Sequence, residues 1–159
     1  PNKATVMIPL KKIARIALVF LLIQIIYGGF VAGLNAGLIH NHWPLMSEGQ
    51  LMHESVILKK NTWLLRLTEG KSGVQFVHRT MAYVVVGLIL FLYFKSRKFT
   101  LSAQQSKGLD VLVVIVFLQF FLGVFTLLYG VPMWLGLTHQ VVAFLLLATM
   151  TYTLYRLSK

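Results

Sequence analysis

The sequence predicts an all-α integral membrane protein, a bundle of four transmembrane helices. Of the 159 residues, 57% are hydrophobic and 12% are charged, whereas a soluble domain carries about 25% charged residues. Four stretches are also long and apolar enough to cross a hydrocarbon core of roughly 30 Å as helices. We expect the spans at about 13–33, 74–94, 109–129 and 134–155, within a single domain over residues 1–159.

The basic residues predict the orientation of these spans. The net charge is +11, but the basic residues lie near the ends of the predicted spans and form no basic face. We therefore expect membrane lipid, and no nucleic acid, as a partner. Those at the N-terminus, in the 95–108 loop and at the C-terminus are Lys3, Lys11, Lys12, Arg15, Lys95, Arg97, Lys98, Lys107, Arg156 and Lys159. The 34–73 loop has only Lys59, Lys60, Arg66 and Lys71. The positive-inside rule therefore predicts cytoplasmic termini in a multi-pass protein of the inner (plasma) membrane.

The long outer loop carries two apolar clusters. Ser47 could cap a short helix that contains Leu51 and Met52, and a second cluster begins at Trp63. Both are too short to span, so we expect interfacial helices, or segments that merely cover the span ends. Asp110 is expected to be a charge at a helix N-terminus. The chain has no cysteine, which excludes disulfides and thiolate metal sites. It begins with Pro1, and we expect no signal peptide; a processed product or a piece of something longer is consistent with this start.

The spans repeat in pairs. Gln24 is followed by Gly28 (QIIYG) in the first, and Gln119 by Gly123 (QFFLG) in the third. The second contains HRTMA from His78 to Ala82, and the fourth HQVVA from His139 to Ala143. Spans one and three run in the same direction, so we expect two parallel copies of a helix pair, related by an axis along the membrane normal.

The two intramembrane histidines are the leading candidate site. Ionisable groups inside a span are costly and by default functional. His78 and His139 lie at matching depth near the outer ends of spans that run the same way. Such a pair suits bis-histidine ligation of haem iron. Zinc would need further ligands at that depth, and the remaining alternative is a pair of hydrogen-bonded residues that bridge helices.

Smaller residues around the histidines complete the predicted cofactor site. Ala82, Ala143, Gly28 and Gly123 are expected to leave room for a flat macrocycle. Gln24 and Gln119 are expected to form interhelical hydrogen bonds, or alternatively to approach a porphyrin edge. Arg79 either snorkels to the interface or pairs with a haem propionate, which Lys71 would serve more weakly. We expect His40, His42 and His53 to be solvated or structural.

Three segments resemble the C-terminal half of haem A synthases: GGFVAGLNAGLIHNHWPLM (Gly28 to Met46), FVHR (Phe76 to Arg79) and LTHQVVAFLLL (Leu137 to Leu147). The AGL-x-AG and N-x-WPLM run is the most specific. The resemblance covers essentially the whole chain and implies one half of an eight-span protein. It further implies a resident haem b ligated by His78 and His139, while substrate haem O occupies the N-terminal half, where its methyl group is oxidised to a formyl.

One position departs from the family pattern. In the N-terminal half of the family, a glutamate thought to be catalytic stands three residues before the histidine. Here that position is Gln75, and Gly136 in the second copy; neither can act as a general base. We therefore assign no catalytic residue to this chain.

The leading hypothesis is a membrane oxidoreductase component, the haem b-binding half of haem A synthase, inactive alone. It would need the N-terminal four-span half or a second copy, and an unidentified electron carrier, for cytochrome oxidase biogenesis. One alternative is a b-type cytochrome electron-transfer subunit without substrate chemistry. Another is a haem-free membrane assembly protein.

Overall fold

A computed structural model describes the chain over residues 7–47, 49–57 and 62–159. The element order is α2 (Ile8–Gly33), η1 (Ala36–Leu38), η2 (Glu54–Val56), α3 (Trp63–Thr68), α4 (Lys71–Ser96), α5 (Ala103–Leu128) and α6 (Met133–Ser158). Within these ranges no strand forms, and the β-type pairing is a bridge between Ser47 and Gln50. The all-α prediction is confirmed. Lys3, Lys59 and Lys60, which entered the charge count above, lie outside the described residues.

Four helices are long and apolar enough to cross a membrane, as predicted: α2, α4, α5 and α6. Each has 26 residues, a length of about 39 Å at 1.5 Å per residue. Each begins before the span that the sequence predicts. The apolar pattern marks only the lipid-embedded part, whereas the backbone hydrogen bonds continue through flanking polar residues such as Lys11 and Lys12.

The start of α5 corrects the prediction for Asp110. The Ser102 hydroxyl accepts a hydrogen bond from the Gln105 backbone N–H, and the Gln105 side chain accepts one from the Ser102 backbone. This reciprocal capping box begins the helix at Ala103. Asp110 therefore lies beyond the first turn, and its assignment as a helix N-terminal charge was wrong. The polar residues between Ser102 and Lys107 concealed the helix start.

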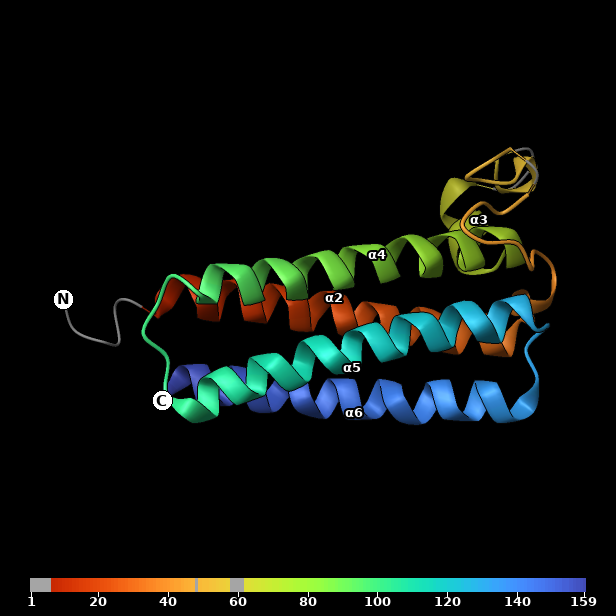
Figure 1. Ribbon diagram of the computed structural model, residues 1–159. Coiled ribbons are helices and arrows are strands. Elements are labelled where there is room, and N and C mark those ends of the chain that lie inside the picture. The colour runs from red at the N-terminus through yellow and green to blue at the C-terminus, as the bar shows by residue number, and fades with distance from the viewer. Residues whose placement is uncertain (1–6, 48, 58–61) are drawn as a thin grey trace.

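The four long helices form two antiparallel pairs (Figure 1). Helix α2 packs on α4 and α5 on α6, while contacts of α2 with α6 and of α4 with α5 close the bundle. Consequently α4 and α6 occupy one diagonal and run in the same direction, and α2 and α5 occupy the other. The start of α2 and the end of α6 lie at one end of the bundle, and the long loop with α3 lies at the opposite end.

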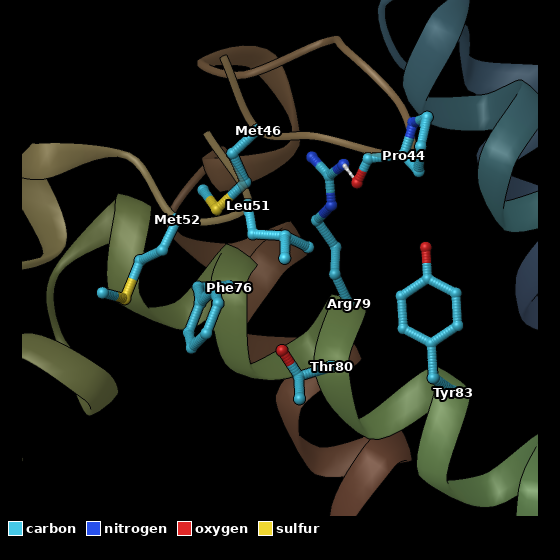
Figure 2. Close-up of a pocket in the computed structure, with 8 residues that line it drawn as sticks. All are labelled: Pro44, Met46, Leu51, Met52, Phe76, Arg79, Thr80 and Tyr83. Atoms are coloured by element: carbon cyan, nitrogen blue, oxygen red, sulfur yellow. Dashed lines mark hydrogen bonds between the residues drawn. The ribbon is translucent and has the colours of Figure 1, made fainter. Parts of the chain in front are cut away.

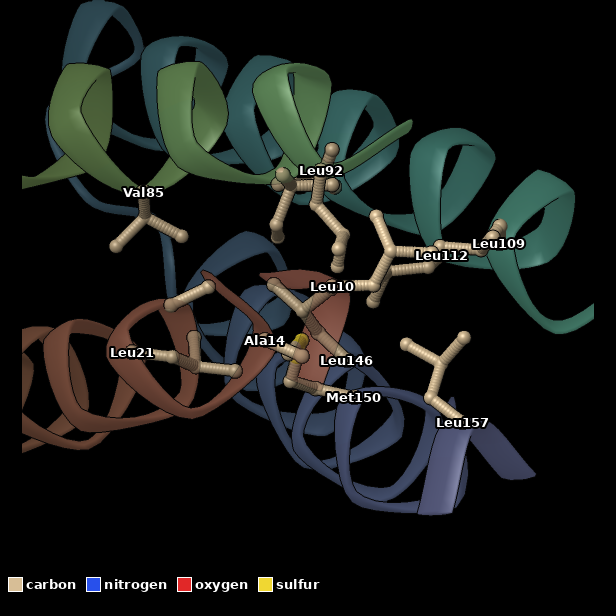
Figure 3. Close-up of a cluster of buried hydrophobic side chains, with 13 residues drawn as sticks. Leu10, Ala14, Leu21, Val85, Leu92, Leu109, Leu112, Leu146, Met150 and Leu157 are labelled. Carbon is tan, nitrogen blue, oxygen red and sulfur yellow. The ribbon is translucent and has the colours of Figure 1, made fainter. Parts of the chain in front are cut away.

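The buried core repeats with the helix pairs. When α2 is aligned with α5 at an offset of 95 residues, and α4 with α6 at an offset of 61, Gln24 corresponds to Gln119 and His78 to His139. The same shifts match buried Ala14, Ala17 and Leu21 with Leu109, Leu112 and Val116, and buried Val85, Ile89 and Leu92 with Leu146, Met150 and Thr153. Much of this set forms one cluster toward the terminal end (Figure 3). The buried faces of the helices thus continue toward His78 and His139, which lie one or two helical turns nearer the outer loop.

The outer loop contains less helix than expected. Ser47 and Gln50 form an isolated bridge, and Ser47 does not cap the helix that the sequence predicted there. The short η2 follows, and its cap is His53, whose Nδ1 accepts a hydrogen bond from the Ser55 backbone N–H at 3.1 Å. The second apolar cluster does form a helix, α3, on which Trp63 is 68% exposed. Its predicted place at the membrane interface stays a prediction.

Candidate functional site

The His78 ring lies against Gln24 and Gly28, the polar and the small residue of the QIIYG motif on α2. The Gln24 side-chain amide nitrogen lies 3.4 Å from His78 Nε2. Four residues on, a Cβ atom built on Gly28 would stand 3.3 Å from His78 Cε1. Residues four apart share one helix face, so Gln24 and Gly28 form a cradle for the imidazole.

The second helix pair builds the same cradle from its own residues. The Gln119 amide nitrogen lies 3.3 Å from His139 Nε2, and a Cβ atom on Gly123 would stand 2.9 Å from His139 Cε1. The prediction of interhelical glutamine hydrogen bonds is confirmed in both copies. The glycines make room for the histidine ring itself; the space that they were expected to leave for a macrocycle stays a prediction.

The two imidazoles project from the diagonal helices α4 and α6. Both residues are half-buried, and so are Ala82 and Ala143, one turn deeper. Among the described residues, Nδ1 of both histidines is buried and has no hydrogen-bond partner. A matched pair of imidazoles is the donor set that ligation of a haem iron requires, because each neutral ring has one unprotonated nitrogen.

A bare metal ion fits this site less well than a haem. In the part of the chain that the structure describes, no group of three or more His, Cys, Asp or Glu side chains gathers to hold an ion. Structural zinc takes four protein ligands and catalytic zinc three. Two axial histidines suffice for haem, because the porphyrin supplies the other four iron ligands. The residues present therefore fit haem.

Arg79 holds the outer loop against α4. Its Nη2 donates to the backbone carbonyls of His42, Pro44 and Leu45 at 2.7, 3.2 and 3.0 Å. Figure 2 shows the bond to Pro44. The other terminal nitrogen, Nη1, is buried without a hydrogen-bond partner in the described structure. Arg79 thus positions the segment above the histidines, and one of its nitrogens remains available. Lys71, the other cation considered for a carboxylate, is exposed at the start of α4.

A cavity of about 320 Å³ opens between the loop and α4 beside Arg79. The loop and the helix each contribute four lining residues, namely Pro44, Met46, Leu51 and Met52, and Phe76, Arg79, Thr80 and Tyr83 (Figure 2). The lining is mostly apolar, and Arg79 is its charged member.

The loop histidines form a structural network, as expected of His40 and His53. Their rings stack with centroids 4.4 Å apart, His40 Nε2 lies 3.0 Å from Ser72 Oγ, and Ser55 Oγ donates to Ser72 Oγ at 2.7 Å. Burial, followed by the charges of His53, Arg79 and His42, lowers the pKa of His40 below its ordinary value of 6.5. His42 is exposed.

The sequence did not predict the structural roles of two further residues near this network. Buried Gln75, which stands where the family carries a glutamate, donates to the His40 carbonyl at 3.1 Å. Asn41 donates to the carbonyls of Gly37 and Leu127 at 2.9 and 2.8 Å, and so joins the loop to the end of α5. The N-x-WPLM run that contains Asn41 was the one available signal.

The fold and site define a four-span membrane bundle with a duplicated histidine cradle, which belongs to the class of candidate haem-binding membrane proteins. Residues 1–151 match the model of the COX15-CtaA family, described as cytochrome oxidase assembly protein. The chain therefore belongs to the COX15-CtaA family.

Curated relatives agree with this assignment. The chain is 68% identical over 159 residues to the haem A synthase of Flavobacterium psychrophilum, and the aligned region covers 100% of the chain and 47% of that relative. It is 68% identical over 152 residues to the haem A synthase of Flavobacterium johnsoniae (96% of the chain, 45% of the relative). It is 40% identical over 144 residues to that of Wolbachia pipientis wMel (91% and 39%). The chain thus spans about half the length of these relatives. No solved structure matches it.

Proposed function

We propose that His78 and His139 are the axial ligands of one haem b, and that the chain is the haem b-binding half of a haem A synthase. The observation that carries the proposal is the duplicated cradle, in which equivalent glutamines and glycines hold two imidazoles on diagonal helices at one depth. When bound, the haem supplies one-electron transfer. The chain's residues hold and orient it.

Each surrounding residue has a task in this proposal. His78 and His139 each offer an unprotonated ring nitrogen to the iron. Ala82 and Ala143 have small side chains, which leave space on the helix faces beside the histidines. The unpaired Nη1 of Arg79 is suited to a propionate, because arginine pairs well with carboxylates and this nitrogen is already buried. Its Nη2 remains on the loop carbonyls.

The catalytic step is assigned to another part of an eight-span unit. Oxidation of the haem O methyl group to the formyl of haem A calls for a group that moves protons, and buried Gln75 and Gly136 have no such group. We therefore propose that this half alone is inactive. It works with an N-terminal four-span half or a second copy, and with an electron carrier, in the inner membrane with both termini cytoplasmic.

A b-type electron-transfer subunit is the second candidate, and the same observation at Gln75 favours it. Membrane fractions supplied with haem O, one containing the chain alone and one containing it together with a four-span partner, separate the two. Formation of haem A by the chain alone would show that the chain holds the whole chemistry. Formation only together with a four-span partner supports the proposed half. An electron-transfer subunit gives no haem A with any such partner.

Haem binding itself is tested with the purified full chain. We expect one haem b per chain, with the spectrum of a low-spin b-type haem, and His78→Ala or His139→Ala should each convert it to a high-spin spectrum. The exposed His42 provides the matched control, since His42→Ala should leave the spectrum unchanged. A wild-type chain that takes up no haem would instead support a haem-free assembly protein.

A further inference from the structure

The two glutamines make the same contact with the two proposed ligands. Gln24 and Gln119 approach the Nε2 atoms of His78 and His139 at 3.4 and 3.3 Å through their amide nitrogens. Their carbonyl oxygens Oε1 are buried and have no hydrogen-bond partner in the described structure. The two contacts come from different helix pairs, so the arrangement is built twice.

The chemistry of the amide determines which ring nitrogen carries the proton. A side-chain amide nitrogen has two N–H donors and accepts no hydrogen bond. The facing Nε2 must therefore be the unprotonated acceptor, and the proton of each neutral imidazole resides on Nδ1. This is the tautomer in which Nε2 offers its lone pair to iron.

From this geometry we infer that Gln24 and Gln119 are positioning residues that stand in for the iron. In the haem-free chain each amide donates to the Nε2 lone pair, keeps the imidazole in the iron-binding tautomer, and satisfies a nitrogen that would otherwise be buried without a partner. When haem enters, the amide releases that lone pair. The inference rests on the proposed haem site.

Release of the glutamines makes haem binding weaker than the histidines alone would allow. A net hydrogen bond of this kind corresponds to a factor of about 2 to 10 in an equilibrium constant. Gln24→Leu or Gln119→Leu removes the competing donor and keeps a similar volume. We expect haem affinity to rise by about that factor for each site, while the haem-free chain loses thermal stability.

Glutamate at the same positions should act in the opposite direction. The carboxylate of Gln24→Glu or Gln119→Glu accepts but does not donate, so it draws the proton onto Nε2 and blocks the lone pair. We expect haem affinity to fall. A glutamine that merely fills space would give losses in both series, or no change in either.

The decisive experiment combines haem titration with nitrogen NMR of the full chain in detergent. In the haem-free wild type, ¹⁵N-labelled His78 and His139 should show a protonated Nδ1 and an unprotonated Nε2, and the glutamate variants the reverse. The titration should give opposite changes for leucine and glutamate. Protonated Nε2 in the wild type, or changes of one sign, would overturn the inference. Failure of the wild type to bind haem would instead overturn the proposed function, and the NMR would still decide the tautomer.

Discussion

Gly123 lies directly against His139: a Cβ atom at this glycine would stand 2.9 Å from the imidazole Cε1, closer than real Cβ contacts come. The equivalent distance from Gly28 to His78 Cε1 is 3.3 Å. The two cradles therefore share a plan but differ in tightness, and the cradle of the second helix pair is the tighter one.

This difference predicts unequal effects of one added methyl group. Gly123→Ala should displace the His139 imidazole and cost about 1–3 kcal/mol of stability, the usual penalty for overpacking. Gly28→Ala should cost less. Thermal unfolding of the two variants in the same detergent makes the comparison. Gly87→Ala is the control, because a Cβ atom there meets nothing within 4 Å. An equal or reversed order would contradict the close packing of His139.

Arg79 should decide how firmly the loop is held. Replacing it with leucine removes the Nη2 contacts to the carbonyls of His42, Pro44 and Leu45, and a charged hydrogen bond has a net worth of about 1.5–3 kcal/mol. We expect faster amide exchange and easier proteolysis in residues 42–57. Arg15→Leu, an exposed position near the other end of the bundle, should change neither rate. Unchanged protection of the loop in the Arg79 variant would contradict this role.

Asn41 predicts a second attachment of the same loop. Its amide nitrogen bonds the carbonyls of Gly37 and Leu127. Asn41→Ala should destabilise the chain by about 1–3 kcal/mol, since it removes two hydrogen bonds worth about 0.5–1.5 kcal/mol each. Asn41→Asp keeps the shape but not the donor and should be at least as damaging. A stable aspartate variant in thermal unfolding would show that shape, and not donation, is what the site uses.

His40 gives the outer loop a pH dependence. Burial first, then the charges of His53, Arg79 and His42, lowers the pKa of His40 in the folded chain below 6.5. The unfolded state then binds protons more readily than the folded state, so stability is full above about pH 6.5 and falls as the pH drops from there toward the lowered pKa. Hydrogen exchange of residues 40–57 at several pH values should show this loosening.

The matched variants for this prediction are His40→Gln and His42→Gln. The first should flatten the pH dependence between the ordinary and the lowered pKa of His40, and the second, at an exposed side chain, should retain it. A loop that becomes better protected as the pH falls would have the wrong sign.

The spans and the histidine pair could be predicted because lipid imposes simple requirements. A long apolar run in lipid must be helical so that its backbone groups form hydrogen bonds. A histidine inside such a run is conspicuous because an ionisable group in lipid costs free energy. The equal depth of His78 and His139 then followed from counting along helices. That Gly28 and Gly123 receive the imidazoles, and do not merely border a cofactor, needed the relative rotation of the helices, which no single span encodes.

The loop was harder to predict because distant contacts determine its shape. Local spacing suggested a helix after Ser47, but Ser47 pairs with Gln50 in a bridge, and the residues just before it are held by Arg79 from α4. Gln75 shows the same limit: the sequence marked it as the place of a missing carboxylate, and the structure gives it a bond to the His40 carbonyl. Such pairs are more than thirty residues apart, beyond the reach of local periodicity.

Electron paramagnetic resonance of the oxidised, haem-loaded full chain tests the central proposal most directly. One haem held by both histidines predicts a single low-spin ferric signal of bis-imidazole type, which either His78→Ala or His139→Ala converts entirely to high spin, while His42→Ala leaves it unchanged. A low-spin signal that persists in one of the single variants, or falls only by half in each, would contradict a haem shared between His78 and His139.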